Sequence, residues 1–422
     1  MIQHTASGSR SNLFAIKGLT YLMFAMFAMT TDSVGLIIPE IIKTFQLSLT
    51  AAGTFQYVTM AGIALAGFLL GHLADRYGRK TTIVAGLILF AAASYLFLAG
   101  TSFLFFCVLM ALSGIAIGIF KTGALALIGD ISRSTAEHTS IMNTVEGFFG
   151  VGSIAGPAIL SALLNRGVPW HWLYVIAGSM CVLLILTALS VRYPTQASHG
   201  SSPLERRERG SVSAVMKNQF VLLFSLGAFL YVAVEAAIYV WMPTLLAGYD
   251  GPGKWIAVYS ISIFFLLRAG GRFLGAWMLN RLSWSAVLTL SSGMILACFA
   301  VSIAGGVGWG VYSLPLSGLF MSVIYPTINS KGISCVPKSE HGAAAGVILF
   351  YTCLSAVLAP LAMGAVSDMM GAPIYGFAVA TCFAALLFLG LVLNSVFNPA
   401  GEIFQRADQS EYNSAANEKA RS

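Results

Sequence analysis

Five ionisable side chains lie inside long apolar stretches of the sequence, where such residues are rare. They are Asp32, Lys121, Glu146, Glu235 and Arg268. A charge at the centre of a lipid bilayer costs about 2.5–3.5 kcal/mol on insertion scales, so these side chains are expected to face a partner or a water-filled space. Carboxylates placed there can take up and release protons, and the cations can bind a polar solute. The five residues therefore predict a polar site inside a membrane protein.

Two of the possible ion pairs match in depth if neighbouring helices run antiparallel. Lys121 and Glu146 lie 13 and 12 residues either side of the turn expected between them, a mismatch of about 1.5 Å along the helix axis. Glu235 and Arg268 are offset by about 4.5 Å around their own turn. If both pairs form, Asp32 is left without a counter-ion.

Asp32 is therefore the predicted coupling carboxylate, because a desolvated carboxylate is readily protonated and a proton can neutralise the site before it changes sides. Glu146 is the second predicted proton-coupling residue. No His lies deep in an apolar stretch, so a proton relay is expected to use carboxylates. A structural ion pair between Asp32 and Lys121 is the alternative interpretation.

Substrate contacts are predicted from the remaining charges and from tyrosines, whose rings combine an apolar face with a hydroxyl group. The predicted substrate-binding residues are Lys121, Glu235, Arg268, Tyr325 and Tyr231. Tyr325 precedes Pro326, where an unwound helix is expected to line a cavity. Arg272 and Lys331, near the ends of their apolar stretches, are expected to be gate or topology residues.

These side chains must be positioned by membrane spans, and the composition provides them. Of the 422 residues, 57% are hydrophobic and only 9% are charged, against about 25% charged in soluble domains. Apolar stretches of about 20 residues predict twelve transmembrane helices. These are residues 13–39, 50–74, 81–98, 103–128, 140–164, 170–191, 220–246, 255–279, 286–304, 310–330, 342–364 and 373–397. The predicted fold class is an all-α membrane protein.

The longest polar break divides the chain into two sets of six spans. We expect an N-terminal bundle over 1–191, a cytoplasmic linker over 192–217, a C-terminal bundle over 218–397 and a disordered cytoplasmic tail over 398–422. Landmarks recur at one spacing: Pro157 and Pro360 are 203 residues apart. This repeat predicts two pseudo-symmetric six-helix bundles with a site at the midplane between them.

The positive charges orient the chain. Of the 23 Lys and Arg residues, only Lys43, Arg166 and Lys254 fall in connections on one side, three lie within spans, and the rest lie on the other side. The positive-inside rule then predicts a multi-pass protein of the cell (inner) membrane with both termini in the cytoplasm. The net charge of +7 thus reflects topology, and nucleic acid is not expected as a partner. Six separated cysteines predict neither a metal site nor a cofactor.

A glycine-rich, basic motif follows the second predicted span. It reads Gly71-His72-Leu73-Ala74-Asp75-Arg76-Tyr77-Gly78-Arg79-Lys80. Gly71 permits close helix contact, and Asp75 can favour the N-terminus of a neighbouring helix. The motif resembles the signature loop of the major facilitator superfamily. That resemblance implies two six-helix bundles and a gating role for Gly71, Asp75, Arg76, Gly78 and Arg79.

Shorter segments resemble the fucose permease and glucose/galactose transporter group of sugar–proton symporters. They include residues 118–127, 147–157, 271–275 and 318–328. The resemblance implies sugar–proton symport. The group commonly carries an acidic residue where this chain has Lys121, and the cation makes an acidic sugar or carboxylate an alternative substrate.

The predicted function is therefore a proton-coupled secondary transporter (symporter) of a small hydrophilic metabolite, working as a monomer in the lipid bilayer. A proton–drug antiporter is the alternative, since Gly152, Gly156 and Pro157 match part of that class's fifth-helix pattern, whereas Leu160 replaces its last glycine. A non-transporting sensor is a further alternative. The chain carries none of the HExxH or GxSxG motifs of hydrolytic enzymes, so it is not expected to be an enzyme.

Overall fold

The computed structural model describes residues 2–47, 49–194, 212–246, 248–279 and 281–412. Every regular element within these ranges is helical. Eleven helical segments there are long and apolar enough to cross a membrane, and the shorter apolar segment Thr54–Leu70 belongs to a twelfth. The predicted all-α membrane fold is confirmed.

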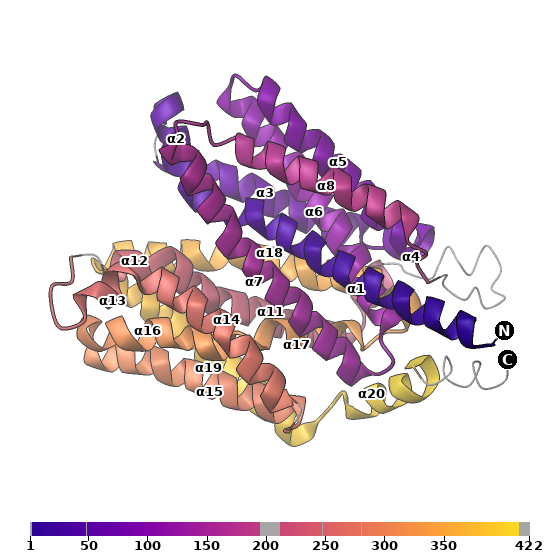
Figure 1. Ribbon diagram of the computed structural model, residues 1–422. Helices are drawn as coiled ribbons and strands as arrows, with labels where there is room; N and C mark the ends of the chain where they lie inside the picture. Colours follow the sequence, from indigo (N-terminus) through magenta and orange to yellow (C-terminus); the bar gives the residue numbers. More distant parts are fainter. Residues whose placement is uncertain (1, 48, 195–211, 247, 280, 413–422) are drawn as a thin grey trace.

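The first half of the chain forms the upper bundle in Figure 1. Its helices are α1 (Ile2–Thr31), α2 (Val34–Phe45), α3 (Leu49–Leu70), α4 (Leu73–Tyr77), α5 (Arg79–Leu96), α6 (Phe103–Ile131), α7 (Thr135–Asn165) and α8 (Trp172–Ser190). Glycine allows α3 and α6 to pack backbone to backbone: a Cβ on Gly114 would overlap the carbonyl oxygen of Thr59. Small residues serve this purpose because lipid supplies little hydrophobic driving force for helix association.

The second half forms the lower bundle in Figure 1. Its elements are α10 (Val212–Val215), α11 (Gln219–Ala236), η2 (Ala237–Trp241), α12 (Met242–Leu245), α13 (Lys254–Val258), α14 (Ser260–Leu279), α15 (Trp284–Gly305), α16 (Val307–Met321), α17 (Ile324–Ile333), η3 (Lys338–Glu340), α18 (His341–Met370) and α19 (Pro373–Phe397). Most of the predicted linker, residues 195–211, lies outside the described ranges.

The first predicted span of each half is interrupted next to a carboxylate. Asp32 and Ser33 form a turn between α1 and α2. In the second half, α11 passes shortly after Glu235 into η2, a π-helical turn. Pro243, which has no N–H to donate, accounts for the loosened turn. Asp32 and Glu235 are 203 residues apart, the spacing of the sequence repeat, so the two interruptions occupy equivalent places in the two bundles.

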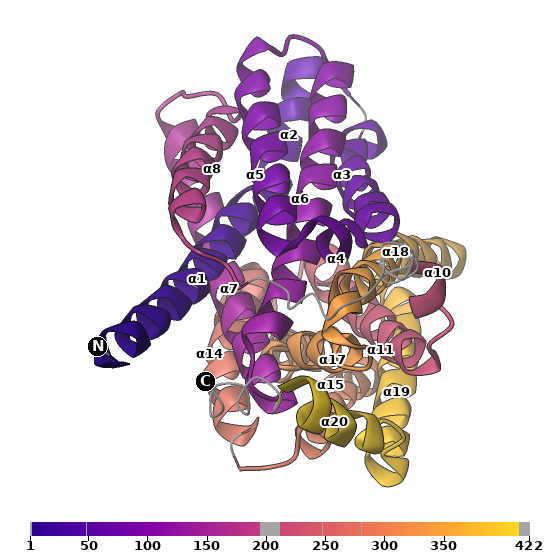
Figure 2. The same ribbon diagram turned by 90° about the vertical axis from the view of Figure 1, so that its right-hand side faces the viewer.

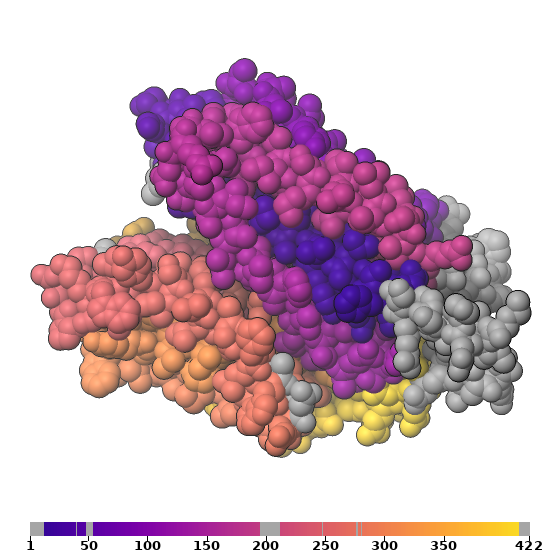
Figure 3. All heavy atoms as spheres, viewed as in Figure 1, coloured from indigo at the N-terminus to yellow at the C-terminus, as the bar shows by residue number. Residues whose placement is uncertain are grey.

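The two bundles touch at the end of the molecule that carries α4, which we call the closed end. There α3 packs against α18, with Gly67 beside Gly346 and Gly71 beside Gly342. Towards the opposite, open end the bundles diverge, so that α2 stands apart from α12 and α13 in Figure 1. The surface is indented between these parts in Figure 3. The molecule is therefore closed at one end and open at the other.

The tail crosses the closed end. Residues 401–412, which the sequence predicted to be disordered, form α20 (Gly401–Ala407) and η4 (Asp408–Tyr412), and 413–422 lie outside the described ranges. The ring of buried Phe404 lies 4.8 Å from Lys331 Nζ. The Asp408 carboxylate accepts hydrogen bonds from the N–H (2.8 Å) and the hydroxyl (3.2 Å) of Thr135. Figure 2 shows α20 in this position. The tail thereby joins the second bundle to α7 of the first.

We expect Asp408→Ala to release the tail, because the start of α7 then loses a charged acceptor worth about 1–2 kcal/mol. Hydrogen exchange of the α20 amides should accelerate about tenfold. Glu402→Ala is the matched control, since Glu402 is exposed and its ion pair is with Arg406 on the same helix. Equal exchange rates in the two variants would show that Asp408 does not hold the tail.

Candidate functional site

Asp32 lies in the turn between α1 and α2 and is exposed to the space between the bundles. Its carboxylate accepts hydrogen bonds from the hydroxyls of Ser153 on α7 and, at 3.2 Å, of Thr31. It interacts electrostatically with Arg268 and Lys121, but neither forms an ion pair with it. The alternative of an Asp32–Lys121 ion pair is therefore not realised in this state, and Asp32 is an exposed carboxylate with no ion-pair partner in the part of the chain that the structure describes.

Glu235 and Arg268 form the ion pair that their depths predicted. Arg268 Nη2 lies 2.6 Å from Glu235 Oε1, so the pair joins α14 to α11 within the second bundle. The Tyr231 hydroxyl lies 3.1 Å from the same carboxylate and 3.0 Å from the carbonyl oxygen of Met321. Since the carbonyl of a terminal helical residue has no intrahelical partner, the carbonyl oxygen of Met321 can accept a hydrogen bond from the Tyr231 hydroxyl. Tyr231 thus connects the ion pair to the end of α16.

Glu146 does not pair with Lys121 as the depth argument predicted. It lies 3.7 Å from Arg272 Nη2 instead, and both side chains are buried. Arg272, expected to be a gate or topology residue near a membrane surface, is therefore an interior partner of a carboxylate. The pair joins α7 of the first bundle to α14 of the second, so it must change when the bundles separate.

Lys121 is left without a carboxylate partner among the described residues. Its Nζ lies 5.0 Å from the centre of the Phe149 ring on α7, a cation–π contact of modest strength. Phe149 also lines a small pocket, with a volume of about 20 Å³, together with Ser153, Arg268 and Arg272. Lys121 therefore stands beside the region where the other charged side chains meet.

The predicted interruption of the tenth span is present and brings two predicted tyrosines together. α16 ends at Met321 and α17 begins at Ile324, just before Tyr325 and Pro326. The rings of Tyr231 and Tyr325 stack with their centres 6.0 Å apart. Tyr325 is partly exposed, whereas Tyr231 behind it is only 1% exposed. In this state, therefore, Tyr325 can offer its ring to the apolar face of a solute, and Tyr231 supports that ring from behind.

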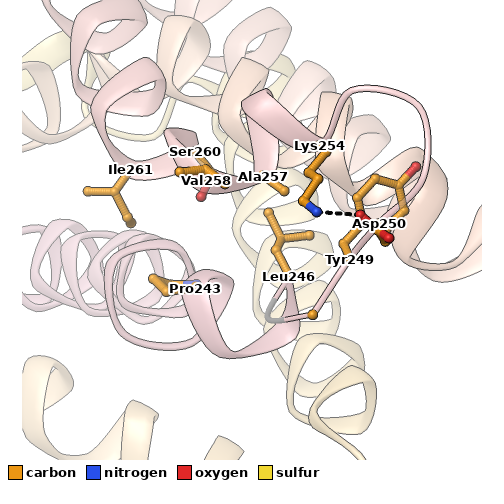
Figure 4. A pocket seen from close by; sticks show the side chains of 10 residues that line it. Pro243, Leu246, Tyr249, Asp250, Lys254, Ala257, Val258, Ser260 and Ile261 are labelled. Carbon is orange, nitrogen blue, oxygen red and sulfur yellow. Dashed lines mark hydrogen bonds and ion pairs between the residues drawn. The ribbon is translucent and has the colours of Figure 1, made fainter.

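A larger cavity than the pocket lined by Phe149 lies away from these residues. It has a volume of about 450 Å³ and opens between α12, α13 and α14 at the open end. Figure 4 shows its lining, with the Asp250–Lys254 ion pair at one side. Both members of that pair are highly exposed, so the pair contributes little energy. We therefore place the candidate site at the charged side chains between the bundles and not in this cavity.

The motif after α3 interlocks the two bundles at the closed end. Asp75 accepts hydrogen bonds from the N–H groups of Gly342 (3.0 Å) and Ala343 (2.9 Å) at the start of α18. Arg79 pairs with Asp75 and with Asp130 (2.8 Å). Burial raises the pKa of Asp75 to about 6 against the opposing effect of Arg79 and the two N–H groups, so at neutral pH Asp75 remains an anion. The expected contact with a helix N-terminus is present.

The other motif residues contribute less directly. Gly71 lies against Gly342 of α18, where a Cβ would come within 2.9 Å of its carbonyl oxygen. Gly78 has φ of 91°, a conformation that favours glycine, and it permits the turn into α5. Arg76 is exposed and stacks 5.4 Å from the Tyr77 ring, outside the interlock.

Comparison with known sequences decides the family. The family model described as Major Facilitator Superfamily matches residues 20–360, which is most of the chain. The chain belongs to the major facilitator superfamily. It is accordingly a multi-pass membrane transporter and not an enzyme.

Within this superfamily the chain is similar to relatives that carry different names. A glucose/galactose transporter of Brucella abortus biovar 1 (strain 9-941) is 23% identical over 404 residues, covering 92% of this chain and 96% of the relative. Protein TsgA of Escherichia coli O6:K15:H31 (strain 536 / UPEC) is 23% identical over 328 residues, covering 77% and 81%.

Solved structures share the fold. The transporter FucP in the outward conformation matches with a TM-score of 0.77 and 20% identity, over 90% of this chain and 99% of that one. The proton:xylose symporter XylE bound to 6-bromo-6-deoxy-D-glucose matches with a TM-score of 0.72 and 14% identity, over 90% and 95%.

This major facilitator protein has a polar ladder at its closed end that the sequence analysis missed. Side chains of α7 meet side chains of α17 and the residue just after it across the two bundles. The hydrogen-bonded pairs are Asn143–Thr327 (3.4 Å), Thr139–Ser330 (3.0 Å) and His138–Ser334 (2.9 Å). All six side chains are buried. Polar residues repeating every three to five positions in both spans were the available signal, because such spacing marks one helix face.

Two histidines also lie in this interface. His138 and His341 are fully or almost fully buried, with nearly parallel rings whose centres are 5.8 Å apart. The sequence placed both correctly near the ends of spans, but it gave no sign that the closed end would bury them. They contribute to the seal between the bundles.

Proposed function

We propose that this transporter is a proton-coupled symporter that carries a small hydrophilic solute, a sugar or an acidic sugar, by alternating access. The observation that carries the proposal is the environment of Asp32. This carboxylate is exposed, accepts a hydrogen bond from Ser153 and has no ion-pair partner among the described residues, between two bundles that are closed at one end. Two relatives of similar length or fold support the class of solute by their names, a glucose/galactose transporter and a proton:xylose symporter.

The proposed placement in the inner membrane follows from charge. The closed end carries Arg76, Arg79 and Lys80, and α1 begins and η4 ends on the same side in Figure 1. The positive-inside rule assigns this end to the cytoplasm. On this basis 1–191 and 218–397 are the two moving bundles and 192–217 is the linker between them. All proposed site residues come from one chain, so a monomer can complete the site.

The proposed cycle starts from the state described here. Proton and solute enter from the open end, the proton binds Asp32, and the solute binds among Lys121, Arg268 and the tyrosines. Return of the site to the cytoplasm requires contacts between the bundles to separate, among them Asp75 with α18, Glu146 with Arg272, the glycine contact of α3 with α18, and the α7–α17 ladder. Neutralising Asp32 lowers the energy of enclosing the site, because a desolvated charge is costly.

Uptake into proteoliposomes tests the proposal. We expect an inward proton gradient to drive accumulation of labelled sugars or sugar acids, and a protonophore to abolish it. A gradient of one pH unit is worth about 1.4 kcal/mol, or about tenfold accumulation for one proton. Uptake that ignores the proton gradient for every solute offered would contradict the proposal.

The structure does not favour the drug-antiporter alternative. Gly152 and Gly156 lie directly against the backbone of α1 at Ala25 and Met29, which accounts for both glycines by packing. The site offers charged and hydroxyl groups, which suit a hydrophilic solute better than a lipophilic cation.

A further inference from the structure

The charged side chains between the bundles are equal in number of each sign, but not all of them form ion pairs. Three carboxylates, Asp32, Glu146 and Glu235, face three cations, Lys121, Arg268 and Arg272. Two ion pairs use four of these groups. The remaining two are Asp32, in the α1–α2 turn, and Lys121, on α6 of the same first bundle, and neither forms an ion pair among the described residues. These six side chains together carry no net charge, and one charge of each sign lies outside the two ion pairs.

Lys121 is placed to meet a solute. Its side chain is partly exposed, and Phe149 of α7 lies 5.0 Å from its Nζ. A solute held between the bundles would therefore lie within reach of a free ammonium group.

The groups around Asp32 indicate what Lys121 does when Asp32 binds a proton. Asp32 faces the Ser153 hydroxyl from α7, Tyr239 from η2, and the charges of Arg268 from α14 and Lys121 from α6. Arg268 is already paired with Glu235. When Asp32 takes up a proton, Lys121 becomes the one uncompensated charge of the six. Enclosing it with a neutral solute would leave a net positive charge in a desolvated site, which is unfavourable.

We propose that the transported solute is a monoanionic sugar acid, whose carboxylate pairs with Lys121 while one proton binds Asp32, so that transport is electroneutral. This inference rests on the proposed symport. The loaded site then carries Lys121 with the solute carboxylate and a neutral Asp32. After both ligands leave, Asp32 and Lys121 compensate each other again. The site is neutral in both crossings, with one anion and one proton moved together.

Matched pairs of probes test this in proteoliposomes. D-glucuronate differs from D-glucose, and D-galacturonate from D-galactose, only in a carboxylate in place of a hydroxymethyl group. We expect an inward pH gradient to drive uptake of a uronate, with a rate unchanged when valinomycin and a potassium gradient impose either sign of membrane potential. Neutral hexoses should enter at least tenfold more slowly.

The alternative outcomes separate the two proposals. Hexose uptake that is driven by the pH gradient and accelerated by an inside-negative potential would overturn the sugar-acid inference and leave the proposed symport intact. Uronate uptake that depends on potential would overturn electroneutrality. Absence of gradient-driven uptake for all four probes would overturn both the inference and the proposed symport.

Variants of Lys121 test whether this residue is the cation that pairs with the carboxylate of the solute. Lys121→Gln should reduce uronate uptake at least about 30-fold, the loss typical of removing one partner of a desolvated charge pair. Lys121→Arg, which keeps the charge, should retain measurable uptake and shows that the position tolerates change. Lys43→Gln, on the exposed surface of α2, is the matched control. Wild-type uronate uptake by Lys121→Gln would refute the assignment.

Discussion

Replacing Asp32 by Asn will abolish proton-driven accumulation of the solute. At a gradient of one pH unit, the ratio of internal to external solute will fall from about 10 to about 1. Asn resembles a protonated carboxylate in shape but cannot bind or release a proton. The site can then still enclose a solute and change sides, but no proton has to move with it. Exchange of external labelled solute for internal unlabelled solute should therefore continue within about twofold of the wild-type rate, since exchange needs no net proton movement.

Asp250→Asn is the matched control for this result. Asp250 is an exposed carboxylate of the loop before α13 and pairs with Lys254 outside the proposed site, so accumulation should not change. Retention of tenfold accumulation by Asp32→Asn would remove Asp32 from the coupling mechanism. Loss of both accumulation and exchange would assign it to solute binding instead.

The second large effect is expected at the glycine contact between α3 and α18 at the closed end. A Cβ on Gly346 would overlap the carbonyl oxygen of Gly67, and neither backbone can move aside easily. Overpacking of this kind costs about 1–3 kcal/mol, and about 1.4 kcal/mol shifts an equilibrium tenfold. Gly346→Val should therefore shift the transporter about tenfold or more away from the state described here and slow net transport.

Alkylation of Cys335 measures that shift. Cys335 is 6% exposed, so in a background that retains it as the sole cysteine, maleimide added on the side of the closed end should label Gly346→Val faster than the wild type. Gly390→Val is the control, because a Cβ on Gly390 meets nothing within 4 Å. Unchanged labelling in Gly346→Val would show that the α3–α18 contact does not set the equilibrium.

Hydropathy determined the all-α architecture, because any backbone that crosses lipid must satisfy its own hydrogen bonds and needs a long apolar stretch to do so. The same arithmetic identified Glu235 and Arg268 as a possible pair, since depth along a helix follows directly from residue number, and the structure forms that pair. The contact of Asp75 with a helix N-terminus was also predictable, because a short, charged motif fixes its local chemistry.

Depth along the helix could not predict the partner of Glu146, nor that Lys121 would have no carboxylate partner among the described residues. Depth gives one coordinate of a side chain, but its direction around the helix advances by about 100° per residue. Lys121 and Glu146 matched in depth, yet Glu146 faces Arg272 on the other bundle. The direction depends on how two bundles far apart in sequence approach each other.

The burial of His138 and His341 and the order of the tail have the same origin. Both features exist because the bundles meet at one end, where side chains that look like loop residues in the sequence become enclosed. The sequence by itself determined the spans, the position of each charge along its helix and the motif that locks the closed end. Only the tertiary structure decided which charges are paired and which two remain free, because pairing depends on helix rotation and on contacts between residues separated by more than a hundred positions.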